Sequence, residues 1–167
     1  MKSLCVTALA AFLAGVTNAG ANEAPFLKSL AGQWAGGGMM KRTTSSSPIN
    51  LDCSFQSKSN GEALSMTGIC RGMIVLSREV SAQLTAAGNQ YAGRYIGPSG
   101  GVSALSGGRS GDAINLAVRW SKLINGDRTA NMTIQRVGDN SIRIRTVDRD
   151  PESGRQVVTS EINLRRQ

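Results

Sequence analysis

Two cysteines, Cys53 and Cys70, flank an Asn60-Gly61 pair, and this segment constrains the fold more than any other in the chain. Asn-Gly between two alternating runs is the strongest short-range hairpin signal, because both residues tolerate positive φ. Folding the chain at this turn brings the two cysteines to within one residue of being directly opposed. Directly opposed residues of a non-hydrogen-bonded pair have Cα atoms about 4.5 Å apart, which a disulfide can bridge. The sequence therefore predicts a Cys53–Cys70 disulfide across a β-hairpin.

Most of the chain after Leu30 consists of short runs of alternating apolar and polar residues, separated by turn signals. The clearest run, 113–120, places Ile114, Leu116, Val118 and Trp120 on one face. Alternation with period two indicates a strand buried on one face. About eight to ten such runs occur along the chain after Leu30, at roughly ten-residue spacing. Serial hairpins without a long crossover favour a closed sheet with an apolar interior. The predicted fold class is all-β, with a single antiparallel up-and-down β-barrel of about eight to ten strands.

The N-terminal segment has the features of an export signal. Lys2 provides a positive charge, residues 4–16 are apolar, and Ala19-Gly20-Ala21 matches a cleavage site, so we expect cleavage after Ala19 or Ala21. Val16 stands where a lipidated cysteine would follow Leu13-Ala14-Gly15, which predicts no lipid anchor. The compact, alanine-rich signal is typical of bacteria. The expected location is therefore the periplasm.

Removal of residues 1–21 leaves one domain, residues 22–167, which is long enough to bury a single core. The mature chain keeps two of the three cysteines, because Cys5 leaves with the signal, and an even count in an oxidising compartment favours a structural disulfide. The net charge falls from +8 to +7, since Lys2 is the only charged residue removed. This charge either favours binding of envelope polyanions or acidic proteins, or serves solubility alone. No later run approaches the ~20 apolar residues that a membrane-spanning helix needs.

The sequence offers little that could support catalysis. It has no histidine, which is the commonest general base and metal ligand. The glycine-rich segment 107–112 lacks the phosphate-loop pattern and predicts a hairpin turn. The acidic residues are expected mostly at turns or on outward faces, and none form a recognisable catalytic pair: Glu62, Glu79, Asp112, Asp127, Asp139, Asp148, Asp150, Glu152 and Glu161. We therefore expect a non-enzymatic protein without a metal or cofactor.

Aromatic residues make up only 4% of the chain. Single-stranded nucleic acids are bound on stacked aromatic side chains beside positive charge, so nucleic acid is not an expected partner. The strand expected over 90–96 carries Tyr91 and Tyr95 on the same face as Gly93. Glycine inside a strand often marks a bend or a close backbone approach. The two tyrosines either line the mouth of a barrel or simply pack on a sheet face.

The segment Pro25-Phe-Leu-Lys-Ser-Leu-Ala-Gly32-Gln-Trp34-Ala-Gly36 resembles the beginning of a lipocalin-type, or calycin, barrel. The resemblance implies a short N-terminal helical turn, followed by a first strand whose Trp34 closes one barrel end. It also implies that a late arginine, Arg165 or Arg166, packs against this tryptophan. Such barrels commonly hold a small apolar ligand in the lumen. Members that bind haem through histidine are excluded, since the chain has none.

The same segment, with the two cysteines, is similar to small periplasmic inhibitors of secreted metalloproteases. Those proteins begin with Leu-x-Gly-x-Trp, matched here by Leu30 to Trp34, and form a small disulfide-containing barrel. This chain is longer than those inhibitors, and residues 91–116 match nothing in them. The resemblance implies a protein partner rather than a small ligand.

Two functional hypotheses follow. In the first, the barrel binds a small apolar or amphipathic molecule in its lumen, with candidate lining residues Trp34, Leu84, Tyr95, Leu116, Val118 and Met132. In the second, the barrel is solid and acts as an interaction module for an envelope polyanion or protein. Arg143 and Arg145 are the candidate anion patch, because guanidinium groups suit phosphate and carboxylate recognition. A lumen of roughly 300 Å³ or more is required by the first hypothesis.

Overall fold

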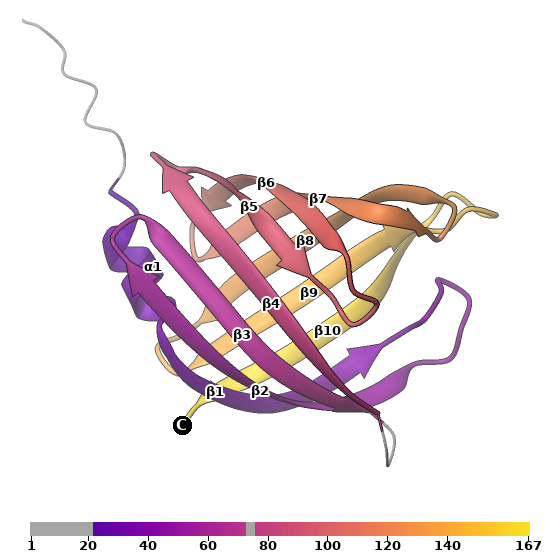
Figure 1. Cartoon of the computed structure of the whole chain (residues 1–167), viewed down its shortest axis with the longest axis horizontal. Coiled ribbons are helices and arrows are strands. Elements are labelled where there is room, and N and C mark those ends of the chain that lie inside the picture. Colours follow the sequence, from indigo (N-terminus) through magenta and orange to yellow (C-terminus); the bar gives the residue numbers. More distant parts are fainter. Residues whose placement is uncertain (1–21, 73–75) are drawn as a thin grey trace, which may run out of the picture.

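The computed structural model describes residues 22–72 and 76–167, which form a short helix followed by antiparallel strands (Figure 1). In chain order the elements are α1 (Ala24–Leu30), β1 (Gly32–Met40), β2 (Ile49–Asn60), β3 (Ala63–Gly72), β4 (Leu76–Ala87), β5 (Gln90–Ile96), β6 (Val102–Ser110), β7 (Ala113–Ile124), β8 (Asp127–Val137), β9 (Ser141–Arg149) and β10 (Gln156–Arg166). The expected signal peptide, residues 1–21, lies outside the described residues. Within the described ranges, no helix is long and apolar enough to cross a membrane.

The strands close into one barrel of up-and-down topology. Each strand pairs with its neighbours in sequence, and β1 closes the sheet by pairing antiparallel with β10, Trp34 opposite Arg166. This confirms the predicted all-β class, the serial hairpins and the single barrel, and the strand number of ten lies at the upper end of the expected range. The short helix is also present before the first strand.

The β2–β3 hairpin carries the predicted disulfide. Cys53 and Cys70 are directly opposed and bonded, with their Cα atoms 4.1 Å apart. The turn lies one residue later than the sequence suggested: Asn60 is the last paired residue of β2, and the two-residue loop is Gly61-Glu62. Gly61 adopts a φ of +56°, a conformation that glycine reaches without steric cost. This shift of one residue is what places the cysteines in register.

The interior of the barrel follows the predicted alternation. Ile114, Leu116 and Val118 of β7 are buried, and the intervening side chains are exposed. Segment 107–112 differs from the prediction, because Gly107 and Arg109 belong to β6 and the turn begins only at Gly111. A Cβ on Gly107 would lie 2.0 Å from the carbonyl oxygen of Asn115. The glycine is therefore needed for close strand approach and not for a turn.

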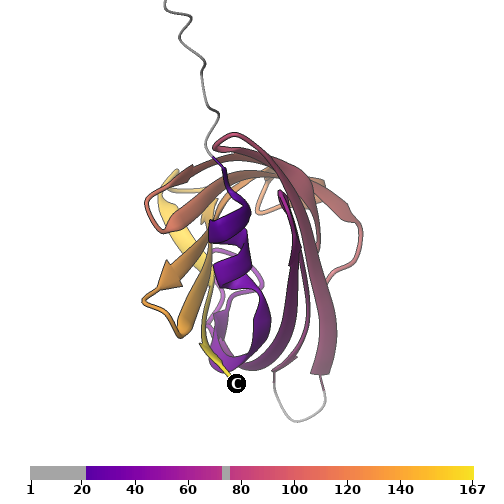
Figure 2. The same ribbon diagram turned by 90° about the vertical axis from the view of Figure 1, so that its left-hand side faces the viewer.

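The two ends of the barrel differ. Helix α1 lies across one end, as Figure 2 shows in the view onto that side. At this end Leu27 and Leu30 are fully buried against the strands. The opposite end carries the β1–β2, β5–β6, β7–β8 and β9–β10 connections (Figure 1). Any opening into the lumen must therefore be sought at that second end.

Candidate functional site

The helix end is closed by a tryptophan and an arginine. Trp34 is buried and donates a hydrogen bond from Nε1 to the carbonyl oxygen of Leu30 at 3.1 Å. The guanidinium carbon of Arg166 lies 4.2 Å from the centre of the Trp34 ring. The same guanidinium donates to the carbonyl oxygens of Ala31 and Ser29 at 2.6 and 2.8 Å. Arg166, and not Arg165, thus fastens the C-terminal end of α1 to the last strand.

The start of the helix is fastened by a buried carboxylate. Glu23 accepts hydrogen bonds from Arg109 Nε at 2.5 Å, from Arg109 Nη2 at 2.8 Å and from the Tyr91 hydroxyl at 2.6 Å. The Arg109 hydrogen bond lowers the pKa of Glu23 more than burial raises it. Burial and the Glu23 carboxylate raise the pKa of Tyr91. Tyr91 therefore closes the helix end and does not line the mouth, and the guanidinium of Arg109 also lies 4.7 Å from the centre of the Phe26 ring.

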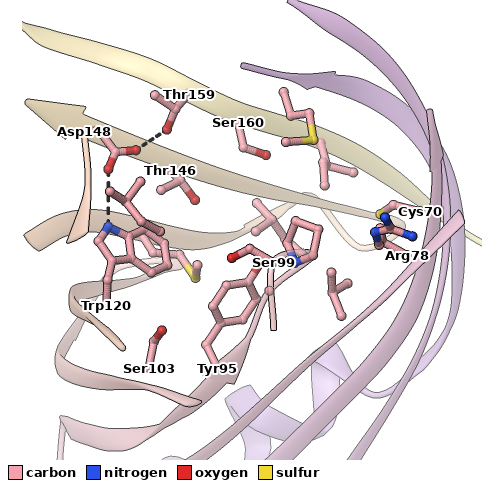
Figure 3. A pocket seen from close by; sticks show the side chains of 18 of the residues that line it. Cys70, Arg78, Tyr95, Ser99, Ser103, Trp120, Thr146, Asp148, Thr159 and Ser160 are labelled. Atoms are coloured by element: carbon pink, nitrogen blue, oxygen red, sulfur yellow. Dashed lines mark hydrogen bonds between the residues drawn. The ribbon is translucent and has the colours of Figure 1, made fainter. Parts of the chain in front are cut away.

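The other end opens into a cavity of about 830 Å³ inside the barrel. Its wall is mainly apolar and includes Phe55, Met66, Val80, Ile134 and Ile162. Figure 3 shows the side chains that surround this space. Pockets of roughly 300–1,000 Å³ accommodate small-molecule ligands in proteins. The lumen is therefore hollow and large enough for such a ligand.

Irregular strand pairing accompanies the opening. The register between β7 and β8 shifts between Arg119 and Ile124, so the intervening residues leave the regular ladder. Trp120, the first of these residues, lines the cavity. A break in pairing of this kind lets a strand bend and redirects its side chains. Trp120 thus enters the cavity wall where the regular pairing of β7 with β8 is interrupted.

The β1–β2 connection is held at the mouth by polar contacts. The hydroxyl of Thr44 donates to Asp150 Oδ2 at 2.6 Å, and the Thr44 amide donates to Asn125 Oδ1 at 3.2 Å. These bonds join the β1–β2, β7–β8 and β9–β10 connections. Hydrogen bonds from Ser153 first, and then from Thr44, lower the pKa of Asp150 to about 2. Asp150 therefore acts as a charged anchor for the mouth.

A second carboxylate, Asp148, lies inside the barrel. Its side chain is 3% exposed and lines the cavity. It accepts a hydrogen bond from Trp120 Nε1 at 3.3 Å and another from the hydroxyl of Thr159, both drawn in Figure 3. Thr159 sits in a bulge of β10, between Val158 and Ser160, which redirects its side chain. The expectation that the acidic residues lie at turns or outside is wrong for Asp148.

Trp120, which contacts this carboxylate, also forms an aromatic pair with Tyr95. Tyr95 and Trp120 both line the cavity, with ring centres 6.2 Å apart and planes inclined by 57°. Burial raises the pKa of Tyr95 to about 12, so its phenol stays neutral at physiological pH. The two rings come from β5 and β7, and Figure 3 shows them on the same side of the pocket. The polar part of the wall thus combines one carboxylate with two aromatic faces.

Cationic side chains surround the outer part of the cavity. Lys41, Arg42, Arg78 and Lys122 belong to its lining, and all except Lys41 are exposed. Arg78 lies on β4 beside Cys70, across the pocket from Asp148 in Figure 3. We call these four side chains the basic rim. The sequence hypotheses did not identify this rim, because its members are scattered over three segments that only the barrel brings together.

Two of the six predicted lumen residues, Tyr95 and Met132, line the cavity. The other four are buried in the packed core outside the cavity wall: Trp34, Leu84, Leu116 and Val118. Of these, Trp34 lies at the helix end. Alternation alone separates inside from outside but does not distinguish filled from empty layers of a barrel. The inward position of Asp148 could be predicted from the sequence, because every second residue from Ile142 along β9 lies on the inner face, and Asp148 is one of them.

The predicted anion patch lies on the outer face of β9. Arg143 Nε donates to Asn163 Oδ1 at 3.0 Å, and Arg145 Nε lies 3.5 Å from Glu161 Oε2. Both arginines are exposed and contact neighbouring side chains of β10. Their guanidinium groups are thus partly engaged within the sheet.

In the part of the chain that the structure describes, no three histidine, cysteine or acidic residues are grouped so that they could hold a metal ion. No protein-family model matches the chain, and no curated protein matches it either.

Proposed function

We propose that this protein is an exported, non-enzymatic β-barrel that binds a small apolar or amphipathic molecule in its lumen. The cavity of about 830 Å³ carries this proposal, because it is open at one end and mainly apolar inside. Burial of a ligand's apolar surface there gives about 25 cal/mol per Å² removed from water. The fastened helix end leaves the opposite mouth as the route of access. In the bacterial setting indicated by the signal sequence, the site of action is the periplasm.

The lipocalin-type resemblance supports the same function. Gly32 and Trp34 begin β1, and Arg166 packs on the tryptophan from β10, in the arrangement that the resemblance implies. The disulfide is compatible with an oxidising compartment. Membership of that superfamily remains part of the proposal, since it rests on this short segment and on the barrel.

The alternative of a solid interaction module has less support. It requires side chains to fill the lumen, whereas a large space remains there. Its candidate patch, Arg143 and Arg145, is partly engaged by Asn163 and Glu161. A polyanion-binding surface predicts affinity that falls steeply with added salt. Binding of an apolar ligand in the lumen predicts little salt dependence.

Calorimetric titration with decanol tests the lumen proposal. Ala82 lines the cavity and is half-buried, whereas Gln83, the next residue of β4, is exposed on the outer face. Ala82→Phe fills part of the lumen and should weaken decanol binding about tenfold or more, a loss of about 1.4 kcal/mol. The matched control Gln83→Phe adds the same side chain outside and should leave the affinity unchanged. No detectable decanol binding to the parent protein, or equal loss in both variants, would contradict the proposal.

A further inference from the structure

Asp148 is a buried carboxylate that faces an open cavity and has only neutral partners. Trp120 Nε1 and the Thr159 hydroxyl each donate one hydrogen bond to it. Each carboxylate oxygen can accept further hydrogen bonds. The ion pairs found among residues 22–72 and 76–167 involve Glu23, Asp112 and Glu161, and none involves Asp148. A buried charge without a counter-charge is costly, so a cationic ligand group would gain strongly from pairing with it.

The aromatic side chains beside Asp148 fit the same kind of group. A cation within about 6 Å of the face of a tryptophan or tyrosine is attracted to the ring. Trp120 and Tyr95 present two inclined rings to the cavity, and the hydrogen bond to Asp148 fixes the indole of Trp120. A carboxylate at the edge of an aromatic pair suits an ammonium group, which combines positive charge with apolar or weakly hydrated substituents.

We propose that the lumen selects amphiphiles with an amine or ammonium head group, which pairs with Asp148 against Trp120 and Tyr95. The alkyl part of the ligand then lies along the apolar wall formed by residues such as Phe55, Val80 and Ile134. This inference rests on the proposed function, since it assigns the ligand class of the same cavity. It adds a polar subsite and a direction of binding.

The basic rim would favour a ligand of the opposite charge, with an anionic head group held at the mouth. Arg42, Arg78 and Lys122 are exposed, so water and salt screen their attraction for a ligand. Asp148 is instead buried, fixed by two hydrogen bonds and adjacent to the apolar wall. Among the described residues that line the cavity, it is the only carboxylate. The buried group therefore determines the preferred ligand more strongly than the solvated rim.

Calorimetric titration of the mature protein with decylammonium, decanol and decanoate tests the inference, because the three probes share one alkyl chain. Hydrogen bonds to charged groups are stronger than those between neutral groups, so decylammonium should bind about tenfold or more tightly than decanol. Asp148→Asn should remove this preference while decanol binding remains. Asp52→Asn, on the exposed outer face of β2, removes one carboxylate elsewhere and should leave the preference unchanged.

A second variant keeps the test decisive if Asp148→Asn fails to fold. Tyr95→Leu retains an apolar lining and removes one aromatic face, so the binding of decyltrimethylammonium should weaken severalfold more than the binding of decanol. Equal binding of decylammonium and decanol to the parent protein would overturn the amine assignment and leave lumen binding intact. Tightest binding of decanoate would overturn it in favour of the basic rim. Failure of all the probes would contradict both this inference and the proposed function.

Discussion

At the scale of single residues, the buried carboxylates Glu23 and Asp148 have opposite environments. Glu23 is paired with the Arg109 guanidinium and the Tyr91 hydroxyl, so its charge is compensated within the protein. Asp148 receives hydrogen bonds from two neutral donors and faces open space. A compensated carboxylate stabilises the fold, whereas one without a counter-charge is suited to binding a ligand. Glu23 therefore has a structural role, whereas Asp148 is the residue on which the proposed ligand preference depends.

Replacement of Glu23 should make the protein less stable in a pH-dependent way. Glu23→Gln leaves the buried part of the Arg109 and Tyr91 cluster without its charged acceptor, which should cost about 1–3 kcal/mol at neutral pH. The Arg109 hydrogen bond lowers the folded-state pKa of Glu23 below its ordinary value of 4.5, so its contribution to stability is complete above that value. It is lost as the pH falls through the folded-state pKa.

Urea unfolding from pH 7 down to pH 3 measures this difference. The parent and Glu23→Gln should differ most at neutral pH, and the difference should shrink progressively as the pH falls below about 4.5 and the parent carboxyl group takes up a proton. The control Glu79→Gln alters an exposed carboxylate on β4 and should follow the parent throughout. A constant difference at all pH values would show that the charge of Glu23 does not contribute.

At the scale of elements, helix α1 and the β2–β3 hairpin stabilise different parts of the barrel. Arg166 connects α1 to β10 through two carbonyl oxygens and the face of Trp34. The disulfide connects β2 and β3 at the level of the cavity, since Cys70 lines it. The first contact closes one end, and the second stiffens the wall near the other.

Loss of the arginine contact should loosen the helix end. Arg166→Ala leaves two backbone carbonyl groups without their charged donor, and we expect a loss of about 1–3 kcal/mol in the free energy of unfolding. Arg165→Ala is the matched control, because Arg165 is exposed on the outer face. This substitution should change the free energy of unfolding by less than about 0.5 kcal/mol. Chemical denaturation of both variants measures the difference. Equal stability of the two variants would contradict the role given to Arg166.

Removal of the disulfide should destabilise the barrel without changing its fold. The bond joins residues separated by 17 positions, and closing a loop of that length stabilises by about 3 kcal/mol in the chain-entropy model. The double variant Cys53→Ala, Cys70→Ala should therefore unfold at lower denaturant concentration while its far-ultraviolet circular dichroism stays that of a β-barrel. A reducing agent should shift the parent in the same direction and leave the variant unaffected. No loss of stability on either treatment would contradict this account.

The strands and their inner faces could be predicted from the sequence because the period-two pattern is strong in segments such as 113–120 and 128–136. Turn positions were less certain: the hairpin at Asn60 shifts by one residue because Gly61, and not Asn60, takes the positive φ. The glycine-rich composition of segment 107–112 predicts a turn, although Gly107 serves close strand approach. Local composition does not distinguish these two uses of glycine.

At the scale of the whole molecule, the barrel is closed at one end and hollow at the other. The residues responsible come from distant segments: Glu23 meets Arg109 at the helix end, and Trp120 meets Asp148 in the lumen. Such long-range pairings cannot be read from periodicity, which explains why only Tyr95 and Met132 of the predicted lumen set line the cavity. The hollow interior itself depends on how ten tilted strands close, and no single segment specifies it.

The two tryptophans of the chain provide separate reporters of the two ends. Trp34 is packed at the helix end, and Trp120 lines the cavity. In Trp34→Phe, where Trp120 is the remaining tryptophan, decanol should shift the emission to shorter wavelength because the ligand displaces water from the indole. In Trp120→Phe, the emission of Trp34 should stay constant. A ligand-dependent change in emission confined to Trp34 would place binding at the helix end and contradict binding in the lumen.

Native mass spectrometry of the protein isolated from its own cell envelope tests the central claim most directly, because it requires no prior choice of ligand. The lumen account predicts a bound species of a few hundred daltons (a size that pockets of this class accommodate) that is lost on denaturation. The Ala82→Phe variant should carry less of it than Gln83→Phe. A parent protein that is isolated without any bound small molecule, and that binds none of the decyl probes, would contradict the account.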